Sequence, residues 1–382
     1  MAAAAAGADA GDRRAATAGT SPVSARTAPG ARLVVQTWLG TRLLMALVAL
    51  VFVLRGAKLT DVLTRWDAAH YLTIASDGYA NPSFVAFFPG WPLLIRSVSL
   101  LGVPAVVAAT ALALVASAVA AAALYRMAGT GAAVAWLLAP TAVFTMVPYT
   151  ESVFCAAAFW AWERASARKW PAAAVLASVA AAMRISGLFL IVALVVLALT
   201  QPGRGQVRWQ RVAWLVLPVL VLGSYLVFLR LQVGTWTAWY DAQASGWSRE
   251  LTWPWVALQH TIDAATPGGY ADAMGWAPMF AFELVSMAAG VLVVLVSLFR
   301  KRWGESVWVG LQVVAFSLSY WFMSVNRALL LWFPLWEEIG RLGQSKGRLP
   351  TWRAVLIGAL VVIALAVQVW WAWRYFGGAW AS

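Results

Sequence analysis

Charged residues are scarce in this chain of 382 residues. Asp, Glu, Lys and Arg make up 11% of it, whereas a soluble domain carries about 25%. Hydrophobic residues reach 62%, in segments of Leu, Val and Ala too long to be hidden in a water-soluble core. These segments lack the alternation of a transmembrane β-barrel. The composition therefore excludes a soluble protein and predicts an all-α polytopic membrane protein.

Cysteine and histidine are nearly absent. The single cysteine, Cys155, excludes an internal disulfide, and its apolar neighbours predict a small core residue. Two histidines, His70 and His260, argue against a zinc site. There is no Walker motif, no GxGxxG after a strand and no HExxH. We therefore expect no cofactor and no metal.

The net charge of +13 has two interpretations, a nucleic-acid partner or a membrane with basic cytoplasmic loops. The basic residues cluster in short loops between apolar segments, which favours the membrane, and we expect no nucleic acid. Basic groups at 164–169, 204–211, 300–302 and 341–353 fall on one side together with the N-terminus, and this side is assigned to the cytoplasm.

Apolar segments divide the chain into a tail and one membrane domain. Residues 1–32 have no apolar periodicity and are expected to form a disordered cytoplasmic tail. Residues 33–382 are expected to form a single transmembrane domain. The first span covers 36–55 and is followed by a long outer loop, 56–90, and a juxtamembrane helix at 91–101. Further apolar segments are expected at 103–125, 131–147, 150–163, 170–183, 186–200, 212–232, 276–299, 306–324, 327–340 and 354–374. This gives about eleven transmembrane or re-entrant helices.

The first outer loop contains the stretch RWDAAHYLTIASDGY, residues 65–79. A helix is expected from about 68 to 76, with Gly78 as its stop. Asp67, His70 and Tyr71 would then share one face, and Trp66 would anchor the helix at the interface. Asp67 is interpreted as the helix N-cap, as a carboxylate pointing into a cavity, or as both. The following SFVAFFPGWPLLIR has two interpretations: a segment that lies on the membrane or dips into it, or aromatic residues that act as a structural wedge, which we favour.

Three later segments also place ionisable residues at the outer side. Glu151, in VPYTESVF, would begin a helix, where the helix dipole favours a carboxylate. Arg184, in AAMRISGLFL, needs an anion, either a lipid phosphate or Glu151. Asn326 and Arg327 open SVNRALLLWFP, and Arg327 is expected either to snorkel to head groups or to bind a ligand.

These four segments are far apart in sequence, yet all map to the outer face. A carboxylate beside arginines at a lipid bilayer suits transfer from a phosphorylated lipid. The aspartate would accept a proton from an acceptor hydroxyl, and arginine would hold the leaving phosphate. A lipid or solute transporter is the alternative, and it would place ionisable residues at mid-membrane. Glu283 is the main residue of that kind.

The order RWDAAHYLTIASDGY, FFPGWPLL, PYTESVF, RISGL and NRALLLWFP resembles the PIG-V-like family, that is GPI mannosyltransferase II and its prokaryotic relatives. The resemblance covers most of residues 36–340. It implies a C-type glycosyltransferase fold, a multi-helix bundle whose active site faces the lumen or exterior. It also implies inverting transfer of mannose from a polyprenyl-phosphate carrier to an acceptor hydroxyl.

The resemblance also implies site residues and partners. It maps the catalytic base onto Asp67, and it assigns substrate binding to the motif residues Trp66, His70, Tyr71, Glu151, Arg184, Asn326 and Arg327. No DxD pair occurs near the first loop, so no metal is implied. The composition suggests a high-GC bacterium, whose plasma membrane would hold the protein, with the endoplasmic reticulum as the eukaryotic equivalent. The acceptor would be a glycolipid, a glycan or a protein, and another lipid-phosphate sugar remains open.

Overall fold

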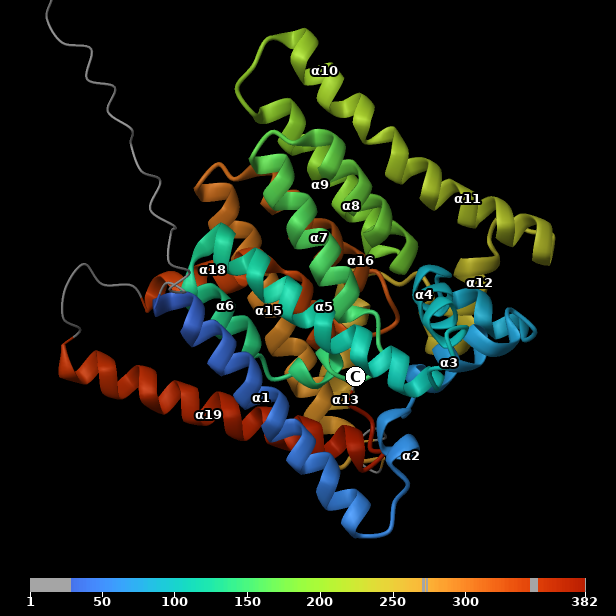
Figure 1. Ribbon diagram of the computed structural model, residues 1–382, viewed down its shortest axis with the longest axis vertical. Coiled ribbons are helices and arrows are strands. Elements are labelled where there is room, and N and C mark those ends of the chain that lie inside the picture. Colours follow the sequence, from blue (N-terminus) through green and yellow to red (C-terminus); the bar gives the residue numbers. More distant parts are fainter. Residues whose placement is uncertain (1–28, 270–271, 273, 344–349, 382) are drawn as a thin grey trace, which may run out of the picture.

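The computed structural model describes residues 29–269, 272, 274–343 and 350–381, and within these ranges all regular structure is helical (Figure 1). The α-helices are α1 (Pro29–Leu54), α2 (Leu59–Leu63), α3 (Asp67–Asp77), α4 (Gly90–Ser99), α5 (Ala105–Ala128), α6 (Thr130–Leu137), α7 (Glu151–Ser166), α8 (Trp170–Met183), α9 (Ser186–Thr200), α10 (Gly205–Trp214), α11 (Val216–Val233), α12 (Ala238–Trp247), α13 (Pro254–Ala265), α15 (Ala277–Phe299), α16 (Trp303–Ser317), α17 (Val325–Ala328), α18 (Phe333–Leu342) and α19 (Thr351–Phe376). Short 3₁₀ helices are η1 (Pro82–Ala86), η2 (Ala142–Thr145) and η3 (Leu329–Leu331).

Five stretches of the described chain are helical, long and apolar enough to cross a membrane. They are Gly30–Leu54, Ala105–Ala128, Gly205–Val233, Ala277–Phe299 and Thr351–Phe376. Their outer sides carry exposed leucine and valine, such as Leu43 on α1 and Val362 on α19, which is favourable only against lipid. The prediction of an all-α polytopic membrane protein is confirmed.

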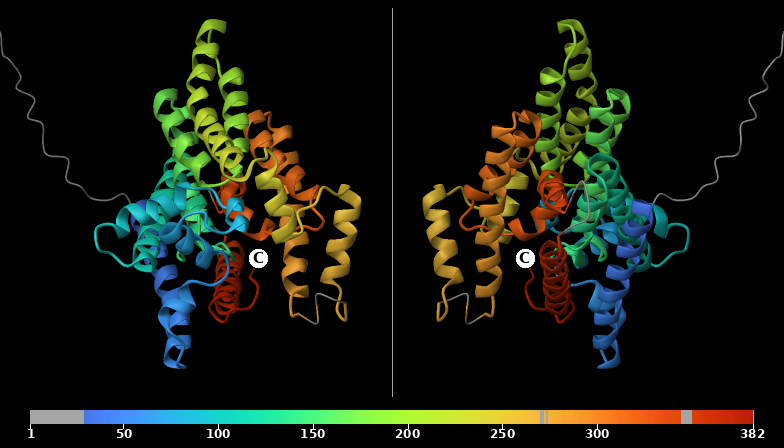
Figure 2. Two further views of the ribbon diagram at one scale, coloured as in Figure 1. Left: turned by 90° about the vertical axis from the view of Figure 1, so that its right-hand side faces the viewer. Right: turned by 90° about the vertical axis from the view of Figure 1, so that its left-hand side faces the viewer.

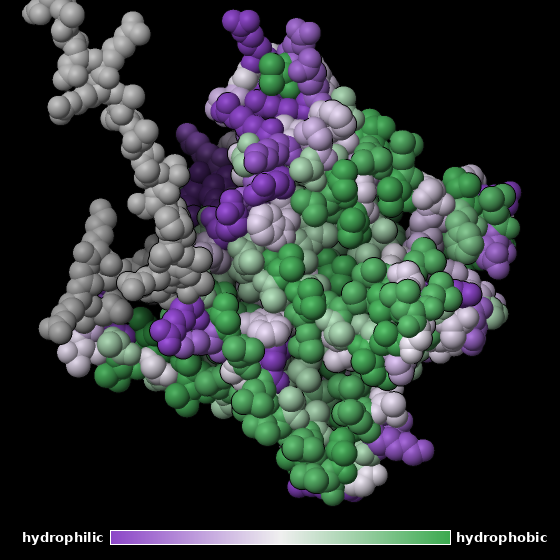
Figure 3. Space-filling view, viewed as in Figure 1, coloured by the Kyte–Doolittle hydropathy of each residue, from purple (hydrophilic) through white to green (hydrophobic). Residues whose placement is uncertain are grey.

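The apolar surface is continuous over much of the molecule. Figure 3 shows hydrophobic residues over most of one face, with hydrophilic residues gathered at the end where α10 lies. Helix α10 reaches one end of the molecule and the end of α1 reaches the other (Figures 1 and 2). Helices α1 and α19, from opposite ends of the chain, pack against each other.

The boundaries of several helices agree with the sequence, and others do not. Helices α8 and α9 coincide with the expected segments 170–183 and 186–200. The segments expected at 131–147, 306–324 and 327–340 are not continuous helices, because each changes to a turn or a 3₁₀ helix partway. Each break leaves backbone N–H and C=O groups outside the helical hydrogen-bond pattern. At membrane depth this is tolerated only inside protein or beside a cavity.

The two long loops that the sequence assigns to the outer side are themselves helical. Loop 56–90 holds α2, α3 and η1, and α4 follows close to the expected juxtamembrane helix. Loop 234–275 holds α12 and α13, which the sequence did not indicate. The expected tail lies mostly outside the described residues, and α1 begins at Pro29, earlier than the expected start of the first span.

Close approaches between helices depend on small residues. A Cβ placed on Gly90, at the start of α4, would lie 2.5 Å from the carbonyl oxygen of Ala182 near the end of α8. A Cβ on Gly340 in α18 would lie 2.4 Å from the backbone nitrogen of Ala132 in α6. Glycine therefore lets these backbones meet, as small residues do between membrane helices. The first contact holds α4 against the segment that carries Arg184.

Cys155 is fully buried in α7, and its Sγ lies 3.4 Å from the carbonyl oxygen of Leu330. The prediction of a small core residue is confirmed. The aromatic residues of the stretch after α3 are also buried in the protein: Phe88 packs on Tyr225, and the indole of Trp91 donates to the carbonyl oxygen of Pro148. Of the two expectations for this stretch, the packing of its aromatic residues agrees with the structural wedge.

Candidate active site

A strained residue, Trp66, stands immediately before helix α3. Its backbone has φ 56° and ψ −131°, a conformation that costs a non-glycine residue about 1–3 kcal/mol. Its indole Nε1 lies 3.3 Å from the carbonyl oxygen of Ala379, which holds the ring in place. Because Trp66 is the N-cap and makes no side-chain cap, the prediction of Asp67 as N-cap is wrong. Gly78 ends the helix at φ 73°, as expected.

Asp67 instead forms an ion pair with Arg327, across 260 residues of sequence. Its Oδ2 accepts from Nη1 of Arg327 at 3.0 Å. Arg327 is only 8% exposed and also donates to Ser324, at 3.1 Å. Its guanidinium lies 5.4 Å and 5.2 Å from the ring centroids of Phe144 and Tyr149. The expectation that Arg327 snorkels to head groups is therefore wrong.

Glu151 and Arg184 form a second ion pair beside the first. Glu151 begins α7, as expected, and is 1% exposed. Its Oε1 accepts from Nη1 of Arg184 at 2.9 Å and lies 3.9 Å from Nε of Arg327. Its Oε2 has no hydrogen-bond partner among the described residues. Arg184 stands where α8 ends, so its backbone is extended and its side chain crosses to α7.

A buried carboxylate holds the short helix that carries Arg327. Both oxygens of Glu283, on α15, accept backbone N–H groups at 2.9 Å, one from Ser324 and one from Asn326. The Asn326 side chain bonds to Ser286 and to the carbonyl oxygen of Met279, and it lines neither of the cavities described below. Glu283, taken from sequence as an isolated mid-membrane acid, thus contacts the same site, and Asn326 anchors α17 to α15.

Asp67 and Arg327 stand between two cavities. The first, the aromatic cavity, has a volume of about 460 Å³, within the range of small-molecule sites. His70 lines it one turn along α3 from Asp67. Its aromatic lining comes from distant segments: Trp66, Phe144, Tyr149, Trp247, Trp276, Trp321 and Trp380. Flat apolar rings beside a few polar groups suit a ligand with both apolar faces and hydroxyl groups.

The second cavity, the basic cavity, is smaller, about 80 Å³. Tyr71 lines it, packed edge-on against Phe87, and so do both ion pairs. Burial, the first cause, and the charge on the Asp67 carboxylate raise the pKa of the Tyr71 hydroxyl. Tyr71 is therefore a neutral hydroxyl in this cavity at neutral pH.

Arg249 also lines the basic cavity, and the sequence interpretation did not assign it to the site. Its guanidinium lies 6.0 Å from the ring of Phe316, and it has no ion pair or side-chain hydrogen bond with any described residue. Burial, and then repulsion from Arg327 and Arg184, lowers the pKa of Arg249 to about 10. It is still a cation at neutral pH. The cavity thus holds three arginines and two carboxylates, an excess of one positive charge.

The structure therefore brings four distant segments to one place. Asp67, Glu151, Arg184 and Arg327 form a chain of contacts, as the sequence predicted from their common face. Trp66, His70 and Tyr71 line the cavities on either side. The one sequence feature that distinguishes Arg249 is its position as an arginine in the otherwise acidic loop 234–275, and this feature alone did not indicate a site.

Comparison with known proteins gave few matches. No family model matches the chain, and neither does any curated protein. Among solved structures, the chain is similar to ArnT from Cupriavidus metallidurans, crystallised with undecaprenyl phosphate. The identity is 16% and the TM-score 0.47, over 89% of this chain and 76% of ArnT.

Proposed function

We propose that this protein is a membrane glycosyltransferase that moves a sugar from a polyprenyl-phosphate carrier to an acceptor hydroxyl, with inversion. The observation that carries the proposal is the position of Asp67, a carboxylate that lines both an aromatic cavity and a basic one. The aromatic cavity would hold the acceptor, and the basic cavity the phosphate of the donor. The carrier would reach the site from the surrounding bilayer.

The charges of the basic cavity support an anionic donor. Arg327 and Arg184 are each held by a carboxylate, which fixes their position. Arg249 has no carboxylate partner among the described residues, so a phosphate group would supply a balancing negative charge. Arg249 and Arg184 are therefore the proposed phosphate ligands, and Arg327 orients Asp67.

The proposed step needs one proton acceptor and no metal. The acceptor hydroxyl oxygen forms a bond to the anomeric carbon while the bond from that carbon to the phosphate oxygen breaks. The proton passes to Asp67, whose Oδ1 makes no hydrogen bond with the described residues. The electron pair of the broken bond stays on the phosphate, where the arginines stabilise the growing charge.

The proposed sugar is mannose, and the proposed family is the PIG-V-like family, on the motifs quoted above. Trp66, His70 and Tyr71 would contact the sugar or the acceptor. Asn326 acts indirectly, through the position of Arg327. We place the site on the outer side of a bacterial plasma membrane, with the N-terminus in the cytoplasm, because the basic loops lie at the other end of the bundle. The acceptor would be a glycolipid, a glycan or a protein.

The test compares two aspartates of the same helix. Asp67→Asn and Asp77→Asn remove the same charge, but Asp77 is exposed at the far end of α3. Membranes containing each variant are supplied with radiolabelled polyprenyl-phosphate mannose, glucose, galactose or arabinose. We expect transfer by wild type and Asp77→Asn, and a loss of roughly 10²-fold or more in Asp67→Asn. The donor that is consumed identifies the sugar.

Two outcomes would contradict the proposal. Normal transfer by a folded Asp67→Asn variant would remove Asp67 as the base. If labelled substrate crossed the membrane of proteoliposomes that contain the protein, and no glycosidic bond formed, the result would favour a transporter. The position of Glu283 argues against the transporter hypothesis. Its carboxylate accepts two backbone N–H groups of the segment that carries Arg327, next to Asp67, so it does not form a separate transport site.

A further inference from the structure

A second basic cavity lies at the opposite end of the bundle from Asp67. It has a volume of about 600 Å³ and is formed where α9 ends, α10 begins and α16 begins. Helix α15 connects the two ends, because Trp276 before it lines the aromatic cavity and Lys301 after it lines this one. Its 23 residues span about 35 Å, enough to cross a bilayer core of about 30 Å.

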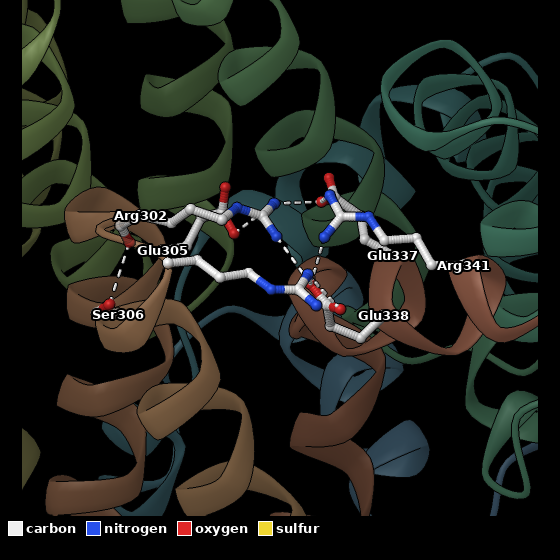
Figure 4. Close-up of polar contacts among 7 residues, drawn as sticks. Arg302, Glu305, Ser306, Glu337, Glu338 and Arg341 are labelled. Atoms are coloured by element: carbon white, nitrogen blue, oxygen red, sulfur yellow. Dashed lines mark hydrogen bonds and ion pairs between the residues drawn. The ribbon is translucent and has the colours of Figure 1, made fainter.

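Part of the charge around this cavity is already neutralised. Arg302 lines it and forms ion pairs with Glu305, at 2.5 Å, with Glu338, at 3.0 Å, and with Glu337. Figure 4 shows these side chains turned toward one another, with Arg341 completing the group on α18. Because Arg302 and Glu305 are part of this group of ion pairs, they contribute little net charge to the cavity.

Two other cations in the lining have no such partner. Arg208, on α10, and Lys301 make no ion pair or side-chain hydrogen bond with the described residues. The Arg208 Nε atom is buried and unpartnered, and so is the Gln201 Oε1 atom in the same lining. A buried donor without an acceptor is unfavourable. The lining thus presents donors, positive charge and one acceptor to a ligand that could satisfy all three.

The rim of the cavity is apolar on the lipid side. Trp303 is 46% exposed beside Lys301, and Leu199 is 36% exposed at the end of α9. A tryptophan next to basic residues at a helix end is typical of the head-group level of a membrane. Basic pockets between helices on the cytoplasmic side suit anionic lipid head groups.

From these features we propose that the cavity binds a phosphate anion with a hydroxyl neighbour, the chemistry of a phosphatidylglycerol head group. Arg208 and Lys301 would bind the phosphate, and Gln201 Oε1 would accept from the hydroxyl. This site is separate from the sugar-transfer site and does not depend on the function proposed above. A lipid and a soluble phosphate ester offer the same chemistry, so the test distinguishes them.

The test uses the full chain, purified in detergent and delipidated. It is titrated with dioleoylphosphatidylglycerol, dioleoylphosphatidylcholine or sn-glycerol 3-phosphate, and native mass spectrometry counts the bound molecules. The variant is Arg208→Gln with Lys301→Gln. The control, Arg168→Gln with Lys169→Gln, removes the same charge from the exposed turn after α7, outside the cavity. Thermal unfolding confirms that both variants fold.

We expect the cavity variant to bind the first phosphatidylglycerol roughly 30-fold more weakly than wild type, and the control variant to bind it normally. Weaker binding of phosphatidylglycerol alone identifies a lipid site, and an equal loss for glycerol phosphate identifies a soluble phosphate site. Equal binding by wild type and the cavity variant would overturn the proposal. An equal loss in both variants would also overturn it, because general surface charge would then explain the binding.

Discussion

Replacing Arg249 by lysine would make carrier binding depend on pH. Both residues are cations, but lysine starts from a lower ordinary pKa, about 10.4. The basic cavity lowers the pKa of Arg249 well below its ordinary value, to about 10, through burial and then the charges of Arg327 and Arg184. A fall of similar size would put the pKa of the new lysine in the Arg249→Lys variant at roughly 8. A cation with a lowered pKa loses its charge as the pH rises through that value.

The size of the effect follows from the lost charge. The variant would be about 90% protonated at pH 7 and about 10% at pH 9. A hydrogen bond to a charged group contributes about 1.5–3 kcal/mol, so losing the cation weakens binding about 10-fold to 100-fold. The second ionisation of a phosphate monoester occurs near pH 6. The carrier's own charge therefore changes little between pH 7 and pH 9.

The assay measures the Kd of undecaprenyl phosphate for protein in detergent, from quenching of tryptophan fluorescence at pH 7, 8 and 9. Wild type should show a flat profile, and Arg249→Gln should bind weakly at every pH. The lysine variant should match wild type at pH 7 and approach the glutamine variant at pH 9. Arg230→Gln, at an exposed arginine late in α11, is the control. Parallel profiles for wild type and the lysine variant would refute Arg249 as a phosphate ligand.

Two further predictions concern the scaffold. Glu283→Gln replaces one of the two carboxylate oxygens that accept from Ser324 and Asn326 with an NH₂ group. The free energy of unfolding in detergent should therefore fall by about 2 kcal/mol. Transfer should also fall while carrier Kd is unchanged; an unaltered turnover would remove Glu283 as a positioning residue. Gly340→Val should destabilise by about 1–3 kcal/mol, because its Cβ would lie 2.4 Å from α6. Gly358→Val is the control, with nothing within 4 Å of its Cβ, and equal melting of the two variants would contradict the packing argument.

The pairing of Arg184 with Glu151 was predictable from sequence, because an arginine in an apolar segment needs an anion and few were available. The convergence of Asp67 and Arg327 was predictable for the same reason, once both were assigned to the outer side. Periodicity also located α8 and α9, since long apolar segments between polar turns leave few alternatives.

Arg249 was not predictable by that argument. Its loop is polar, so a cation there has no apparent cost and needs no partner. Only the fold shows that the loop after α12 covers the basic cavity and that Arg249, half-buried, lines it. The broken segment 327–340 was missed for a related reason. Its apolar composition is compatible with one continuous helix. Instead, hydrogen bonds from the backbone N–H groups of Ser324 and Asn326 to Glu283 fix a separate short helix that contains Asn326 and Arg327.

The arrangement of charges explains how the site keeps its shape. Arg327 contacts Asp67 and lies near Glu151, and Glu151 binds Arg184, so these four groups hold one another in place. Buried charges that are paired in this way keep a fixed geometry, whereas an unpaired one is costly. Arg249 is the remaining cation of the cavity, and it stands on a loop and not on a long helix. A phosphate that binds Arg249 would therefore complete the charge balance of the cavity without displacing the carboxylates, and Asp67 would remain ionised and correctly oriented to accept a proton.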